Sequence, residues 1–132
     1  MLKFYVLQQY FNRMAITNSV AYQKAYQFAI RIVNAYKHLT KEKKEYVLSK
    51  QLLRSGTSVG ANLAEANGAI SHADFRAKIS ISYKEIQETK YWLTLLKDTG
   101  YIEEKAYQSI NTDAEEISKI LFSLLKKMKP EG

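Results

Sequence analysis

The chain of 132 residues contains no cysteine, only one proline and only two histidines. Without cysteine it can form neither a disulfide nor a thiolate metal site, which fits the reducing cytoplasm where we expect this protein to reside. His38 and His72 lie far apart, and neither follows a glutamate by three residues, so we expect no metal site and no cofactor. Pro130 lies next to the C-terminus and glycines number five, so long uninterrupted helices are predicted.

Long hydrophobic runs are also missing. The longest uncharged stretch near the N-terminus, residues 4–12, includes two glutamines and is far too short to span a bilayer. It lacks the small-residue cleavage site of a signal peptide, so we expect no membrane partner. Residues 1–17 are predicted to be an N-terminal extension. Three interpretations stay open: a disordered segment, a start placed upstream of a true initiator at Met14, or an arm that docks on a neighbouring subunit.

Acidic residues are scarce in the first part of the chain. Residues 1–50 hold nine Lys or Arg and two Asp or Glu, whereas residues 51–132 hold eleven of each, so the net charge of +7 falls entirely in the first part. This asymmetry favours a polyanionic partner, RNA or DNA, although a basic surface that serves only solubility also fits. The predicted nucleic-acid-binding residues are Lys24, Arg31, Lys37, Lys41, Lys43 and Lys44.

Apolar residues recur at steps of three and four from residue 19 onward. The pattern predicts helices over residues 19–39, 41–67, 72–98 and 103–128. Thr40 is a suitable N-cap for the second helix, Gly68 a suitable stop, and Ser71 with Asp74 reads as a capping box before the third. We therefore predict an all-α fold, an antiparallel up-down-up-down left-handed four-helix bundle, forming one domain over residues 18–128 with a tail at 129–132.

The third predicted helix carries the most regular pattern. An unbroken a/d seam runs through Phe75, Ile79, Ser82, Ile86, Thr89, Leu93 and Leu96. A second row of large side chains lies beside it, at Ile81, Glu85, Glu88, Trp92 and Leu95. A helix with two such rows has two neighbours, and we therefore expect a homo-oligomer.

Residues 51–66, QLLRSGTSVGANLAEA, place many small residues inside a predicted helix. A glycine in a helix interior costs about 1 kcal/mol relative to alanine, so two glycines indicate that another backbone approaches closely. A large side chain at Gly60 is expected to collide with a neighbour. The predicted packing and interface residues are Arg54, Ser55, Gly56, Ser58, Gly60, Asn62, Glu65, Ser82, Glu85 and Glu88.

Catalytic signatures are missing as well. No His or Lys is spaced to activate Ser55 or Ser58, and the GTSVG stretch lacks the ending of a phosphate loop. The polar groups among the packing residues fit either a site or a network that fixes the register of the second and third helices, and we favour the network. We expect a protein that is not an enzyme.

The segment 51–66 resembles the signature of a family of small four-helix-bundle proteins, the 23S rRNA intervening-sequence proteins. In the second predicted helix the resemblance rests on Gln51, Arg54, Ser55, Ser58, Asn62 and Glu65, and in the third on Ser82 and Glu85. Ile81 departs from the family pattern, in which glycine is common at that position. The resemblance implies assembly into a ring-like homopentamer.

A related protein widens the expectation about function. The accessory variability determinant of diversity-generating retroelements is similar in being a basic pentameric barrel that engages RNA and a reverse transcriptase. The resemblance therefore implies a non-enzymatic RNA-binding or ribonucleoprotein adaptor, with a reverse transcriptase among the partners to be tested. The alternative is a protein-binding assembly scaffold with no nucleic-acid ligand.

Overall fold

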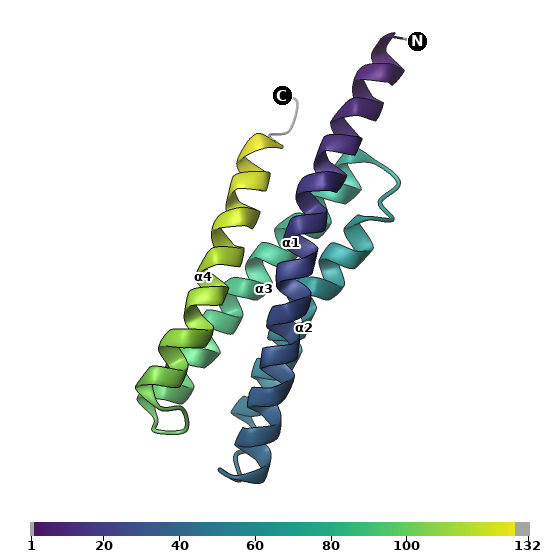
Figure 1. Ribbon diagram of the computed structural model, residues 1–132. Coiled ribbons are helices and arrows are strands. Elements are labelled where there is room, and N and C mark those ends of the chain that lie inside the picture. The colour runs from purple at the N-terminus through teal and green to yellow at the C-terminus, as the bar shows by residue number, and fades with distance from the viewer. Residues whose placement is uncertain (1, 129–132) are drawn as a thin grey trace.

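A computed structural model describes the backbone of residues 2–128 and the side chains of residues 20–128. The fold is all-helical, and no strand occurs within residues 2–128. The four helices are α1 (Leu2–Lys41), α2 (Leu48–Ala66), α3 (His72–Asp98) and α4 (Glu104–Lys127) (Figure 1). The predicted tail at 129–132 lies outside the described residues.

All four helices contribute to one apolar core. α1 packs against α2 and α4, and α3 packs against the same two helices. In α3 the buried positions are the seven that the a/d pattern predicts, Phe75 through Leu96. The second row beside this seam is partly buried, with Ile81 41% exposed and Glu85, Trp92 and Leu95 half-buried. None of the described helices combines the length and hydropathy that a membrane crossing needs.

α1 is longer than the sequence pattern predicts. It begins at Leu2 rather than near residue 19, and its backbone remains helical across residue 17. Residues 1–41 contain no proline and no glycine, so nothing in them interrupts the helical hydrogen bonds. The side chains of residues 1–19 lie outside the described part of the chain, and a role for them as a docking arm stays a prediction.

α2 begins later than predicted, and its predicted N-cap is wrong. Thr40 lies inside α1, where its hydroxyl donates to the carbonyl oxygen of Tyr36 at 2.9 Å. The chain then turns through Lys44, whose φ of +54° is in the left-handed region that non-glycine residues seldom adopt. This turn separates the two helices, so residues 41–47 cannot belong to α2.

Glu45 supplies the cap that α2 needs. Its carboxylate accepts hydrogen bonds from the backbone N–H groups of Val47, Leu48 and Ser49 at 3.1, 3.0 and 2.7 Å. Burial raises the pKa of the Glu45 carboxyl, but the hydrogen bonds from Ser49, Leu48 and Val47 outweigh it, and the pKa is lowered overall. The charged carboxylate also suits the positive end of the α2 dipole.

The predicted boundaries of α3 are confirmed. The Ser71 hydroxyl oxygen accepts from the backbone N–H of Asp74 at 3.0 Å, and the Asp74 carboxylate accepts from the N–H of Ile70 at 3.3 Å. Gly100, with a φ of +86°, lets the chain leave α3 by a left-handed turn. Gly68 follows the end of α2 as predicted, and its N–H donates to the Glu65 carbonyl oxygen at 3.0 Å.

The two glycines inside α2 face α1. A Cβ atom at Gly56 would lie 2.7 Å from Cγ1 of Ile32, a fully buried side chain of α1. A Cβ atom at Gly60 would lie 3.6 Å from the backbone of Ala25, which is an ordinary van der Waals contact. Gly56, rather than Gly60, is therefore the position at which α1 leaves no room for a side chain.

α3 contacts the other side of α2 through polar pairs. The Ser82 hydroxyl donates to the carbonyl oxygen of Val59 at 2.8 Å, and the Thr89 hydroxyl lies within hydrogen-bond distance of the Ser55 hydroxyl, at 3.0 Å. All of these groups are buried. Because a buried polar group without a partner is costly, the pairs fix the register of α2 on α3.

Replacing the two glycines separately tests this packing. We expect Gly56→Ala to lower the free energy of unfolding by about 1–3 kcal/mol, because the β-branched Ile32 cannot turn away from the added methyl group. Gly60→Ala is the matched control, and we expect it to leave stability unchanged or raise it by up to about 1 kcal/mol. Urea unfolding measures both, and equal effects would contradict the assigned contact.

Replacing Glu45 by glutamine tests the cap through pH. A carboxyl whose pKa is lowered by folding stabilises the protein above its unfolded pKa, near the ordinary 4.5, and this contribution is lost as pH falls through the folded pKa. We therefore expect Glu45→Gln to be less stable than wild type by about 0.5–2 kcal/mol at pH 7. In urea unfolding at descending pH the difference should vanish in the acid range, and a pH-independent difference would exclude the carboxylate as the cause.

Candidate functional site

The six predicted nucleic-acid-binding cations fall into two groups. Lys24 and Arg31 extend from α1 to α4. The Lys24 ammonium pairs with the Glu116 carboxylate, and Arg31 Nη1 lies 2.6 Å from Asp113 Oδ2. Arg31 Nη2 also donates to the hydroxyl of Ser109 at 2.9 Å. These two cations hold α1 to α4, and their charges are matched locally.

The other four cations, Lys37, Lys41, Lys43 and Lys44, lie in the last turn of α1 and the turn that follows. We call them the lysine cluster. All four are exposed, and none forms an ion pair with another described residue. The carboxylate of Glu45, which is close in sequence, is engaged by the α2 backbone. Glu42 is also exposed between Lys41 and Lys43, so residues 37–44, with four lysines and one glutamate, present a net charge of +3 to solvent.

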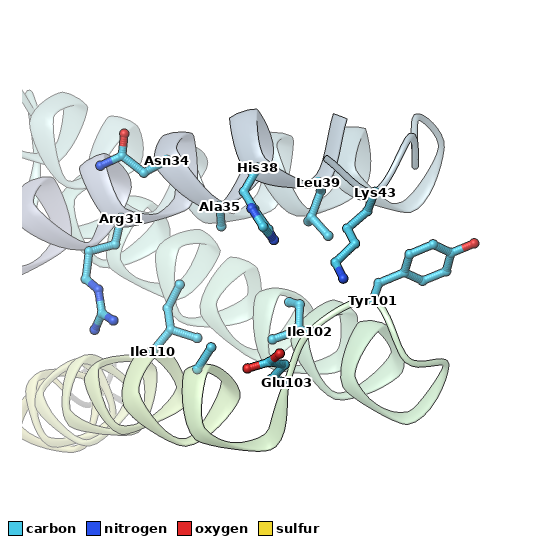
Figure 2. Close-up of a pocket in the computed structure, with 11 residues that line it drawn as sticks. Arg31, Asn34, Ala35, His38, Leu39, Lys43, Tyr101, Ile102, Glu103 and Ile110 are labelled. Atoms are coloured by element: carbon cyan, nitrogen blue, oxygen red, sulfur yellow. The ribbon is translucent and has the colours of Figure 1, made fainter. Parts of the chain in front are cut away.

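A cleft of about 500 Å³ opens beside the lysine cluster (Figure 2). It lies between the last turns of α1 and the first turns of α4, at the end of the molecule where the α3–α4 turn also lies (Figure 1). Lys43 belongs to both the cluster and the cleft. Apolar and polar residues line it together: Ala35, Leu39, Ile102, Ala106 and Ile110, then Arg31, Asn34, His38, Lys43, Tyr101 and Glu103.

Backbone hydrogen bonds hold the two turns that border this cleft. On the α1 side, the N–H of Glu42 donates to the His38 carbonyl oxygen at 2.8 Å. On the α4 side, the N–H groups of Tyr101 and Ile102 both donate to the Leu96 carbonyl oxygen, at 2.8 and 3.3 Å. The main chain therefore fixes the two turns from which Lys43, Tyr101 and Ile102 reach the cleft.

The predicted packing residues lie on a different face, between α2 and α3. Arg54 Nη1 lies 3.3 Å from Glu85 Oε2, its Nη2 pairs with Glu88, and the indole N–H of Trp92 donates to the same Glu88 oxygen at 2.9 Å. This network does join the two helices. The Arg54 side chain is 49% exposed, so the network lies at the edge of the interface.

The remaining packing residues divide by position. Ser55, Gly56, Gly60 and Ser82 are buried within the chain's own helix contacts. On the outer side of α2, Ser58 donates to the Arg54 carbonyl oxygen and Asn62 donates to the Ser58 carbonyl oxygen, at 2.6 and 2.8 Å. Glu65 Oε1 lies 3.5 Å from the Lys78 ammonium of α3. None of these contacts assembles a nucleophile with a base.

Sequence reasoning missed the partners on α4 and the lining of the cleft. Asp113 and Glu116 stand three residues apart on one side of α4, opposite Lys24 and Arg31, and this pairing of rows is the signal that could have found them. Tyr101 and Glu103 reach the cleft from a turn, for which no periodic pattern exists. Within the described residues, no group of three or more His, Asp or Glu is placed to hold a metal ion.

Comparisons with known proteins agree with this architecture. Residues 17–123 match the family model described as 23S rRNA-intervening sequence protein. A crystal structure of a protein of unknown function from the S23 ribosomal protein family of Bacteroides thetaiotaomicron VPI-5482 is 54% identical, with a TM-score of 0.82. The alignment covers 83% of this chain and 98% of that one. No curated protein matches the chain.

The family match includes parts of all four helices and both turns that border the cleft. The four-helix fold and the similar crystal structure support the same assignment. The chain belongs to the 23S rRNA intervening-sequence protein family.

Proposed function

We propose that this protein is a non-enzymatic RNA-binding adaptor of the cytoplasm that contacts its ligand through the lysine cluster. The observation that carries the proposal is the contrast among the six predicted cations. Lys24 and Arg31 are matched by carboxylates of α4, whereas the four lysines of the cluster have no ion-pair partner in the described part of the chain. Unmatched lysines can neutralise phosphates and release the counterions bound to them.

The position of the cluster suits a polymeric anion better than a small one. Four lysines within eight residues span the end of a helix and a turn, so they present several charges to a chain of phosphates. Lysine acts as a flexible point charge, without the fixed fork of arginine that selects one geometry. Binding through the lysine cluster is therefore expected to be largely independent of sequence and to weaken steeply as salt rises.

We propose that the chain folds as an antiparallel up-down-up-down left-handed bundle and assembles into a homo-oligomeric ring, with five subunits favoured by the family resemblance. Several large apolar side chains on three helices support the assembly, because they are at least 43% exposed in the single chain: Val20, Tyr26, Ile30, Tyr91 and Phe122. A ring would repeat the lysine cluster and strengthen weak contacts through multivalency. By likeness to the accessory variability determinant, a reverse transcriptase is a candidate protein partner.

Charge-removing variants test the RNA proposal. We expect Lys37, Lys41, Lys43 and Lys44, changed together to glutamine, to weaken binding of a structured RNA and to make the slope of log K against log salt shallower by up to about 3. The matched control changes Lys84, Lys119, Lys126 and Lys127, which are also exposed and without an ion pair among the described residues. Filter binding at several salt concentrations measures both variants.

The two variants remove the same charge, so they separate a local site from general attraction. Equal losses would show that only net charge matters, and full binding by the cluster variant would favour a protein-binding scaffold. In that case the apolar residues exposed on the helices would be the surface that binds a protein partner. Binding of duplex DNA as tight as that of RNA would broaden the ligand to nucleic acid in general.

Molar mass tests the assembly. We expect light scattering coupled to gel filtration to give about five times the 15.2 kDa of one chain. The exposed apolar side chains provide the reason, since they lose contact with water on assembly. Phe122→Glu and Tyr91→Glu, tested separately, should lower the mass if their faces are buried between subunits. A molar mass equal to that of one chain at micromolar protein concentration would contradict the proposed ring.

A further inference from the structure

The cleft beside the lysine cluster has apolar and hydrogen-bonding side chains that phosphate binding does not need. Leu39 and Ile110 lie at its apolar floor and are 0% and 6% exposed, and Ala35 and Ile102 lie beside them. Figure 2 shows His38 and Lys43 extending from the α1 side toward the start of α4. We propose that this cleft receives one unpaired base of a single-stranded RNA while the lysine cluster holds the neighbouring phosphates.

The rim of the cleft matches the edge of a base. The Asn34 amide offers donors and an acceptor, the His38 imidazole offers one of each, and the Glu103 carboxylate accepts. Sequence-specific recognition of RNA uses such groups on the Watson–Crick edges of bases that have left the stack. The apolar floor suits the faces of a planar ring, which is poorly solvated once it is unstacked.

The size and rigidity of the cleft also fit. Its volume of about 500 Å³ lies within the ~300–1,000 Å³ typical of small-ligand sites. Arg31 is fixed by Asp113 and Ser109, and the Tyr101–Ile102 segment is tied to the Leu96 carbonyl oxygen. A base would therefore enter a formed site, and little conformational freedom of the protein would be lost on binding.

Glu103 supplies a contact that distinguishes one base from another. Its carboxylate can accept from the exocyclic amino group of a base, a contact that a ligand carboxylate or phosphate cannot make because these anions only accept. Phosphates instead meet Lys43 at the edge and the rest of the cluster outside. The arrangement favours cytosine, adenine or guanine over uracil, which has no amino group.

A cavity-filling variant tests the proposal, which rests on the proposed RNA binding. We expect Ala106→Trp to weaken binding of a cytidine oligonucleotide about tenfold and to leave binding of an RNA duplex unchanged. Ala61→Trp is the matched control, because Ala61 is exposed on α2 away from the cleft, and it should change neither. Binding is followed by fluorescence anisotropy, with circular dichroism confirming that each variant folds.

A second variant avoids reliance on a bulky side chain. In wild type we expect cytidine 5′-monophosphate to shift the NMR signals of Ala35, Ile102 and Ala106 at lower concentration than uridine 5′-monophosphate does. Glu103→Gln should abolish most of that preference, because an amide can donate to the uracil carbonyl oxygen as well as accept.

The outcomes separate the two proposals. If wild type binds neither RNA, both proposals fall. If wild type binds both RNAs and Ala106→Trp keeps its affinity for the oligonucleotide, the cleft holds no base, and the lysine cluster stands alone. If Ala106→Trp weakens duplex binding equally, or if the monophosphates leave the cleft signals unmoved, the base site is likewise overturned.

Discussion

The contact between Gly56 and Ile32 sets how closely α1 lies against α2, and the rest of the arrangement depends on it. The Cγ1 atom of Ile32 occupies the place that a Cβ atom at Gly56 would need. α1 occupies that side of α2, and Ser55 and Val59 of α2 face α3. There the Thr89 hydroxyl hydrogen-bonds to Ser55, and the Ser82 hydroxyl hydrogen-bonds to the Val59 carbonyl oxygen. α2 is therefore the element against which the register of both neighbours is fixed, by shape on one side and by buried hydrogen bonds on the other.

The pairing of α1 with α4 is of a different kind and leaves a cleft open between the two helices. Here long polar side chains reach across, Arg31 to Asp113 and Lys24 to Glu116, in place of a seam of small residues. Such side chains hold two helices without bringing their backbones together, and clefts remain between them. The same pairs match part of the positive charge of α1. The four lysines of the cluster have no ion-pair partner among the described residues, and the nearby Glu45 carboxylate caps α2 instead.

Periodic features could be predicted from the sequence, and features built by single long-range contacts could not. The seven buried positions of α3 follow from steps of three and four, and the Ser71 cap follows from local spacing. The start of α2 could not be predicted, because Lys44 adopts a positive φ and Glu45 caps the helix from within the turn. Arg31 and Asp113 are 82 residues apart, so local spacing does not indicate that this cation is matched, and only a comparison of the charged rows on α1 and α4 could have suggested the pair.

Ultraviolet crosslinking to RNA, followed by mass spectrometry of the peptides, locates any bound nucleic acid on the protein. If RNA lies along the lysine cluster and the cleft as we propose, crosslinked nucleotides concentrate on peptides carrying Lys43 and on the peptide carrying Tyr101, since these residues border the cleft. Crosslinks spread evenly over exposed lysines, or gathered at Arg54 and Trp92 on the α2–α3 face, would contradict this placement of the RNA.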